Sequence, residues 1–314
     1  MQTALWFTTF GLSLVVLTHF AKLFVKSAEE FAKAMSWSSF FVGLTILALG
    51  NTLPELGTSI WATVTNKSSI VAATVVGANI TNGLLILGVS AIAAKTLPMG
   101  SDGIRQQMGL FLISSILLAV TLYDGQFVWT EGLLMLTGFL AYSLFSYEEH
   151  KAGRLEAFKN WVLGRELTGR MVFLLLATAL VTTAASYLSI YALEQVASRA
   201  NILPSLIGAS VLALGTSLPE LTTAWIAIKQ KNSEMAVGTL IGSSVLNATV
   251  VMAVPSFFRP LNVSSDLLII GLPFLLISTA LLLFAVSQRK LHAYEGILFL
   301  VLYILFIQQL FSSF

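Results

Sequence analysis

The stretch ALGNTLPEL, residues 48–56, places a proline and a glutamate inside an otherwise apolar segment. A second stretch, ALGTSLPEL at residues 213–221, repeats it at an offset of 165 residues. The register holds without a gap between 43–82 and 208–247, and 15 of these 40 paired positions are identical. Two interrupted, acid-bearing hydrophobic segments in corresponding halves of a chain indicate the binding site of a secondary transporter.

The composition indicates a membrane protein. Of 314 residues, 56% are hydrophobic and only 10% are charged, whereas soluble domains carry about 25% charged residues. The chain has no cysteine, which excludes disulfides and thiolate metal sites. No pattern supports catalysis, nucleic-acid binding or a cofactor, and none indicates a protein partner, so we expect a non-enzyme in a lipid bilayer.

Hydrophobic segments long enough to cross a bilayer occur ten times. The sequence therefore predicts an all-α polytopic fold with ten transmembrane helices in two five-helix repeats, 1–146 and 171–314, joined by a cytoplasmic loop, 147–170. The predicted spans are 3–24, 38–64, 69–94, 107–123 and 128–146 in the first repeat, and 171–192, 203–228, 235–257, 267–287 and 293–311 in the second.

Basic residues predict the orientation, because lysine and arginine concentrate in cytoplasmic loops. With both termini outside, 14 of the 17 basic residues fall on the inner side and three on the outer side. An odd number of spans in each half then makes the second repeat inverted relative to the first. We expect a multi-pass protein of the cell membrane, which would be the inner membrane in a bacterium.

The repeated stretch has the chemistry of a cation site. Gly50 and Pro54 predict a break in the helix that leaves carbonyl oxygens without partners, and Glu55 follows at the start of the next helical turn. In the second copy, Thr216, Ser217 and Glu220 stand in the same register as Asn51, Thr52 and Glu55.

Glu55 and Glu220 are the only acids in the sequence that lie far from the ends of predicted spans. An ionised carboxylate at this depth costs ~2.5 to 3.5 kcal/mol on insertion scales. The alternative is that the prolines merely kink helices and the acids pair with inert groups, but no basic residue lies at matching depth. Two carboxylates with hydroxyl, amide and carbonyl oxygens suit calcium or sodium.

A second segment in each repeat adds amide and hydroxyl groups. Asn79 and Asn82, and likewise Ser244 and Asn247, are three residues apart and so share a helix face. Such residues also occur where transmembrane helices pack closely and hydrogen-bond to one another. Their repetition beside the glutamates favours a functional role.

These motifs resemble the cation/calcium antiporter superfamily, which includes sodium/calcium and proton/calcium exchangers. The resemblance extends over nearly the whole chain, and its sharpest elements are GTSLPE at 215–220, its variant GNTLPE at 50–55, and the segments 77–82 and 242–247. It implies two inverted five-helix repeats, a central site on the second and third helices of each, and sliding of the first helix of each repeat past that site.

The resemblance also implies roles for individual residues. Glu55 and Glu220 would be shared carboxylates for calcium and the counter-ion. Oxygens around them would complete the cation sites, contributed by Asn51, Thr52, Asn82, Thr216, Ser217, Ser243 and Asn247.

The chain departs from the family pattern at three places. Asn51 stands where threonine is usual, Ala78 stands where serine is usual, and neither Asn82 nor Asn247 is the aspartate found at one of these positions in many sodium/calcium exchangers. The missing oxygen at Ala78 puts one sodium site in question.

The sequence favours a secondary antiporter that exchanges calcium for sodium or protons by alternating access. One alternative is an antiporter for another divalent cation, such as magnesium or manganese, since oxygen ligands suit these ions as well. Another is a passive cation channel with the same ligands, although a site between inverted repeats favours alternating access.

Overall fold

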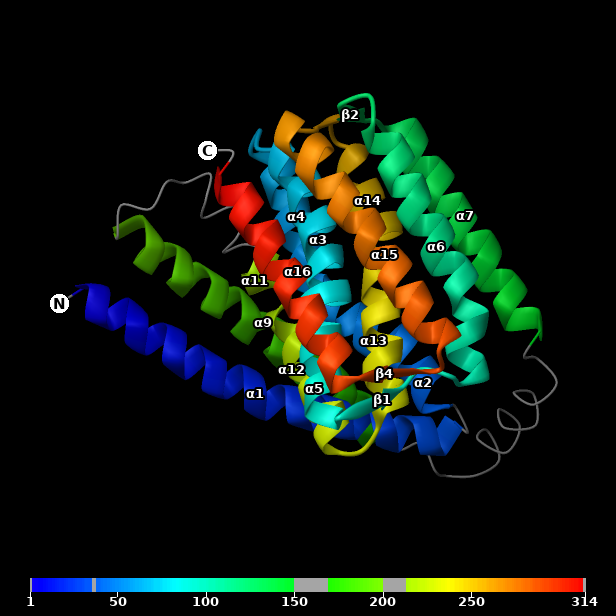
Figure 1. The fold of residues 1–314 in the computed structure, drawn as a ribbon. Coiled ribbons are helices and arrows are strands. Elements are labelled where there is room, and N and C mark those ends of the chain that lie inside the picture. The colour runs from blue at the N-terminus through cyan, green and yellow to red at the C-terminus, as the bar shows by residue number, and fades with distance from the viewer. Residues whose placement is uncertain (1, 36–37, 150–168, 200–212, 313–314) are drawn as a thin grey trace.

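The computed structural model describes residues 2–35, 38–149, 169–199 and 213–312. They form an almost entirely helical bundle (Figure 1). The elements up to residue 149 are α1 (Gln2–Met35), α2 (Ser39–Val42), the π-helical turn η1 (Gly43–Leu47), α3 (Ala48–Val64), α4 (Ser69–Ile80), π-helical η2 (Thr81–Ile86), α5 (Leu87–Ala94), β1 (Thr96–Pro98), α6 (Asp102–Leu122), β2 (Gln126–Phe127) and α7 (Trp129–Glu149).

The second described part of the chain begins at residue 169 and is also mostly helical. It consists of α9 (Gly169–Arg199), α11 (Ala213–Thr216), α12 (Leu218–Lys229), α13 (Ser233–Leu246), π-helical η4 (Asn247–Val251), α14 (Met252–Ser256), β3 (Leu261–Asn262), π-helical η5 (Leu267–Gly271), α15 (Leu272–Ser287), β4 (Lys290–His292) and α16 (Ala293–Ser312).

Eight continuous helical segments within the described ranges are long and apolar enough to span a bilayer. They match eight of the ten predicted spans. The predicted span 128–146 coincides with helix α7, and 203–228 is described only from residue 213 onward. Most of the predicted loop 147–170 lies outside the described residues. The all-α polytopic prediction is confirmed, whereas the count of ten and the inverted repeats stay predictions.

Helices α1 and α9 lie side by side and slant across one side of the bundle (Figure 1). Both are longer than predicted, at 34 and 31 residues, because a helix that crosses a layer obliquely needs more residues than an upright one. Ser189 Oγ donates a hydrogen bond to Ser13 Oγ at 2.8 Å and joins the two helices within their buried contact.

Two short antiparallel sheets join segments that are far apart in sequence. Strand β1 pairs with β4, with Leu97 opposite Leu291, and β2 pairs with β3, with Phe127 opposite Leu261. Helices α12 and α5 end near the first sheet, and α3 ends near the second, where the side chain of Arg259 hydrogen-bonds Asn66 Oδ1. We call these two ends of the bundle the β1–β4 face and the β2–β3 face.

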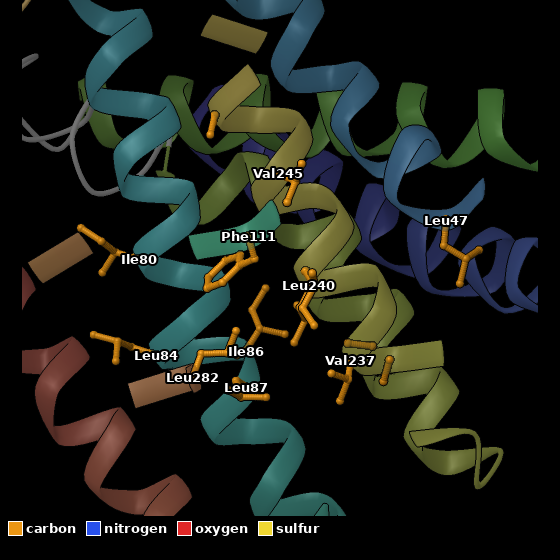
Figure 2. Packing of buried hydrophobic residues seen from close by; sticks show 14 of the residues in the cluster. Leu47, Ile80, Leu84, Ile86, Leu87, Phe111, Val237, Leu240, Val245 and Leu282 are labelled. Atoms are coloured by element: carbon orange, nitrogen blue, oxygen red, sulfur yellow. The ribbon is translucent and has the colours of Figure 1, made fainter. Parts of the chain in front are cut away.

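The core lies where α13, with α4, η2 and α5, passes through the centre of the bundle. Apolar residues on these elements are fully buried and pack against the surrounding helices (Figure 2). Helices α1 and α16, by contrast, expose large apolar side chains such as Leu12 and Ile304, as expected for surfaces that face lipid. The centre of the bundle is therefore closed to solvent, and it contains polar as well as apolar side chains.

Candidate functional site

The buried centre of the bundle contains both glutamates identified in the sequence. Glu55 lies on α3 and Glu220 lies in the first turn of α12, and they are 1% and 0% exposed. A hydrogen bond between Asn51, one turn before Glu55, and Thr223, one turn after Glu220, joins the two helices at this level. None of the carboxylate oxygens of the two glutamates has a hydrogen-bond partner, which is costly for a buried polar group unless something else binds it.

The first copy of the motif does not break where the sequence predicts. Helix α3 continues through Pro54, and the irregular backbone lies earlier, in the π-helical turn η1. A proline removes the hydrogen bond to the carbonyl four residues before it, which here is that of Gly50. The hydroxyl of Thr183 on α9 donates to Gly50 O at 3.4 Å, so a neighbouring helix compensates for the lost bond and the helix continues.

The second copy does break. Helix α11 ends at Thr216, Ser217 has φ −86° and ψ 5°, and α12 begins with Pro219 in its first turn. This confirms the prediction for one of the two copies. The break points the Ser217 hydroxyl into the interior, where it is 2% exposed and has no hydrogen-bond partner.

Asn51 links the two motifs directly. Its Nδ2 donates to Thr223 Oγ1 at 2.8 Å, and that threonine lies one turn after Glu220. The hydroxyl of Thr223 in turn donates to Pro219 O and Glu220 O. With its amide nitrogen engaged, Asn51 leaves its Oδ1 buried and without a partner, so this residue presents an acceptor beside the glutamates.

The second segments of the two copies, residues 77–82 and 242–247, are joined to each other by hydrogen bonds. Asn79 Nδ2 donates to Ser244 O at 3.0 Å and Asn82 Nδ2 donates to Ser244 Oγ at 3.3 Å. The Oδ1 atoms of both asparagines remain buried without partners. Asn247, the counterpart of Asn82, makes no hydrogen bond through either side-chain atom. The structure therefore unites the amide-bearing segments that the sequence placed beside the glutamates.

The π-helical turns η2 and η4 lie at these asparagines. Asn82 is the second residue of η2 and Asn247 is the first of η4. π-Helical turns frequently occur at functional sites. The sequence did not predict them, because a single extra residue in a helical turn leaves the apolar pattern nearly unchanged.

The remaining predicted site residues are all buried, but they differ in what their hydroxyls do. Thr52 donates to Ala48 O and Leu49 O of its own helix, so its proton is committed there. Ser243 is fully buried, and its hydroxyl has no hydrogen-bond partner. Thr216 is fully buried at the end of α11.

One buried polar residue near the glutamates received no role from the sequence. Ser59 follows Glu55 by one helical turn on α3, is 3% exposed, and has a hydroxyl without a partner. The signal that could have identified it is its spacing of four residues from the glutamate.

The site as a whole is rich in oxygen acceptors. Ten buried side-chain oxygens without hydrogen-bond partners belong to the residues of this centre, namely Asn51, Glu55, Asn79, Asn82, Ser217, Glu220, Ser243 and Asn247. Carboxylate, amide and hydroxyl oxygens are the ligands that calcium and sodium prefer. Such an arrangement can bind hard cations and exclude most water from them.

Comparison with known proteins identifies the family of this chain. The family model described as sodium/calcium exchanger protein matches residues 5–148 and 170–311. The sodium/calcium exchanger MaX1 of Methanosarcina acetivorans is 30% identical over 96% of this chain and 97% of its own. An uncharacterised membrane protein of Methanocaldococcus jannaschii is 31% identical over 96% of each chain. A solved structure of the sodium-calcium exchanger NCX_Mj, soaked with sodium and strontium, superposes with a TM-score of 0.82 at 28% identity, covering 98% of this chain and 99% of that one. The chain belongs to the sodium/calcium exchanger protein family.

Proposed function

We propose that this membrane protein is an antiporter that exchanges calcium for sodium or protons, and that both ions use the site between Glu55 and Glu220. The observation that carries the proposal is the group of ten buried oxygens without hydrogen-bond partners around the two carboxylates. Native proteins rarely leave so many buried acceptors unpaired. Bound cations would supply the missing interactions, and the family is one of exchangers.

The burial of the site supports alternating access. Both carboxylates are at most 1% exposed, so an ion held there is closed off from both faces. A channel needs a continuous pore through which ions pass in file. An antiporter needs a site that opens to one face at a time, and the oblique pair of helices α1 and α9 beside α3 and α12 is the element we assign to that motion.

The counter-ion follows from charge and ligand number. Two carboxylates carry two negative charges, which one calcium, two sodium ions or two protons neutralise. Ala78 is fully buried and provides no side-chain oxygen, whereas its counterpart Ser243 does. We infer that the protein exchanges calcium with fewer sodium ions than relatives with serine at this position, or with protons.

The test is calcium flux in sealed proteoliposomes under imposed sodium and proton gradients, applied separately. Glu55→Gln and Glu220→Gln should each abolish exchange, because each removes half of the charge that binds calcium. Glu30→Gln is the matched control, since Glu30 lies at an exposed end of α1 and pairs only loosely with Lys26 at 3.9 Å. Exchange at a near wild-type rate in either site variant would refute the two-glutamate site, and calcium flux without any coupled gradient would favour a channel.

A further inference from the structure

Helix α3 carries a buried polar stripe that begins at the site. Asn51, Glu55, Ser59 and Thr63 are four residues apart, and none is more than 3% exposed. Residues at this spacing lie one above another on the same face of a helix. The stripe therefore extends from the glutamate by two further turns toward the β2–β3 face, where α3 ends at Val64.

The two hydroxyls that follow Glu55 in the stripe, those of Ser59 and Thr63, differ in their hydrogen bonds. Thr63 Oγ1 donates to Ser59 O at 2.9 Å, as buried threonines in helices commonly do. The Ser59 hydroxyl makes no such bond, and the carbonyl of Glu55 that it would use accepts instead from Thr58. Ser59 thus holds a buried oxygen, one turn from a carboxylate, that no protein group satisfies.

The other repeat has no equivalent stripe. In the register that aligns Glu55 with Glu220, Ala224 stands for Ser59 and Ile228 stands for Thr63. Both are buried, at 0% and 7% exposure. The face of α12 that continues from Glu220 toward the β1–β4 face is therefore apolar, whereas the face of α3 that continues from Glu55 is polar.

We propose that Ser59 is a cation ligand on the path between the central site and the β2–β3 face, where it holds an ion together with Glu55 as that ion enters or leaves. This rests on the proposed function and adds a further ion-binding residue to it. A hydroxyl next to a carboxylate offers a hard cation a second oxygen one turn outside the site. Because the stripe has no counterpart toward the β1–β4 face, the residue acts on one face only.

The test measures the calcium concentration that gives half-maximal uptake from each face separately, in right-side-out and inside-out proteoliposomes. Ser59→Ala should raise this concentration on the order of fivefold at the β2–β3 face and leave the β1–β4 face unchanged. Ser115→Ala is the matched control, since it removes a buried serine hydroxyl on α6 that only donates to Phe111 O. An equal change at both faces, or none at either, would overturn the proposal.

A gain-of-hydroxyl variant tests the same idea without removing any native group. Ala224→Ser places a hydroxyl one turn from Glu220 and should lower the half-maximal concentration at the β1–β4 face only. No change at that face would show that a hydroxyl at this register binds no ion. If the wild-type protein moves no calcium in these vesicles, the proposed function itself fails. If the wild-type protein exchanges calcium and Ser59→Ala does so in the same way, only the proposed role of Ser59 is overturned.

Discussion

At the scale of single residues, the site is a set of polar groups that the protein itself leaves unsatisfied. Asn51, Asn79 and Asn82 each commit the amide nitrogen to a hydrogen bond and keep the oxygen free. An amide side chain can both donate and accept hydrogen bonds, and with its nitrogen engaged it offers only its acceptor oxygen. The sequence identified these residues by their repetition, but which atom each would offer depends on Thr223 and Ser244, which come from the other half of the chain.

The glutamates should cost stability when no cation is bound, because burial of an unpaired charge is unfavourable. We expect Glu55→Gln to melt at a temperature no lower than that of the wild type in buffer free of calcium and sodium. Calcium should raise the wild-type melting temperature, since a ligand that binds only the folded state stabilises it, and should leave the variant unchanged. A large destabilisation of the ion-free variant would mean that Glu55 has a structural partner.

The departures at Asn51 and Ala78 should be visible in ion coupling. Asn51→Thr with Ala78→Ser restores the two hydroxyls of the family pattern. The hydroxyl at position 78 would replace a fully buried methyl group. We expect a steeper dependence of calcium flux on sodium concentration and a larger effect of membrane potential, because an additional sodium ion would move per cycle. The wild type could instead already show steep, voltage-dependent activation by sodium, and the double variant could leave it unchanged. That outcome would contradict the inference that Asn51 and Ala78 weaken a sodium site.

At the scale of helices and strands, the sequence predicted where elements lie better than how they bend. The pairing of glycine and proline predicted breaks in both copies, yet only the copy at Ser217 breaks, because Thr183 supports the carbonyl that Pro54 frees in the other. That support comes from α9, 133 residues away in sequence. Local pattern alone could not reveal it.

Close helix contacts provide a prediction at this scale. Helices α5 and α16 cross at Gly88 and Gly296, where a Cβ on Gly88 would lie 2.8 Å from Gly296 O and a Cβ on Gly296 would lie 2.6 Å from Gly88 O. Small residues allow transmembrane helices to approach in this way. We expect Gly88→Ala to lower the free energy of unfolding by about 1 to 3 kcal/mol.

The matched control for this contact is Gly109→Ala. Gly109 lies within α6, and apart from its chain neighbours and the nearby backbone of its own helix no atom lies within 4 Å of a Cβ placed there. Alanine is favoured over glycine inside a helix by about 1 kcal/mol, so this variant should be neutral or more stable. Thermal unfolding in one detergent compares the two. Equal melting temperatures would show that the α5–α16 crossing relaxes without cost.

At the scale of the whole molecule, the same repeat accounts for the centre and for both faces. Sheets β1–β4 and β2–β3 each join one segment from before residue 150 to one from after residue 250. Strands β1 and β3 begin at positions 96 and 261, which is the 165-residue offset of the glutamate motifs. The sequence therefore predicted the fold class from its apolar segments, and the pairing of the two buried motifs from this register. It did not predict the strands, because segments of two or three residues are too short to show the alternation of apolar and polar residues that is typical of a strand.

The orientation in the membrane is the prediction that belongs to the molecule as a whole. The 14 to 3 distribution of basic residues predicts that the loop 147–170 lies in the cytoplasm and that both termini lie outside. In that orientation the β2–β3 face, toward which the stripe through Ser59 extends, would be the outer face. Because the chain contains no cysteine, Ala152→Cys introduces a single thiol without background. A membrane-impermeant thiol reagent should fail to label it in intact cells and should label it once the membrane is opened. Gln2→Cys should show the reverse pattern. Labelling of Ala152→Cys from outside intact cells would mean that the orientation is the opposite of the predicted one. The face at which Ser59→Ala acts would then be the cytoplasmic face.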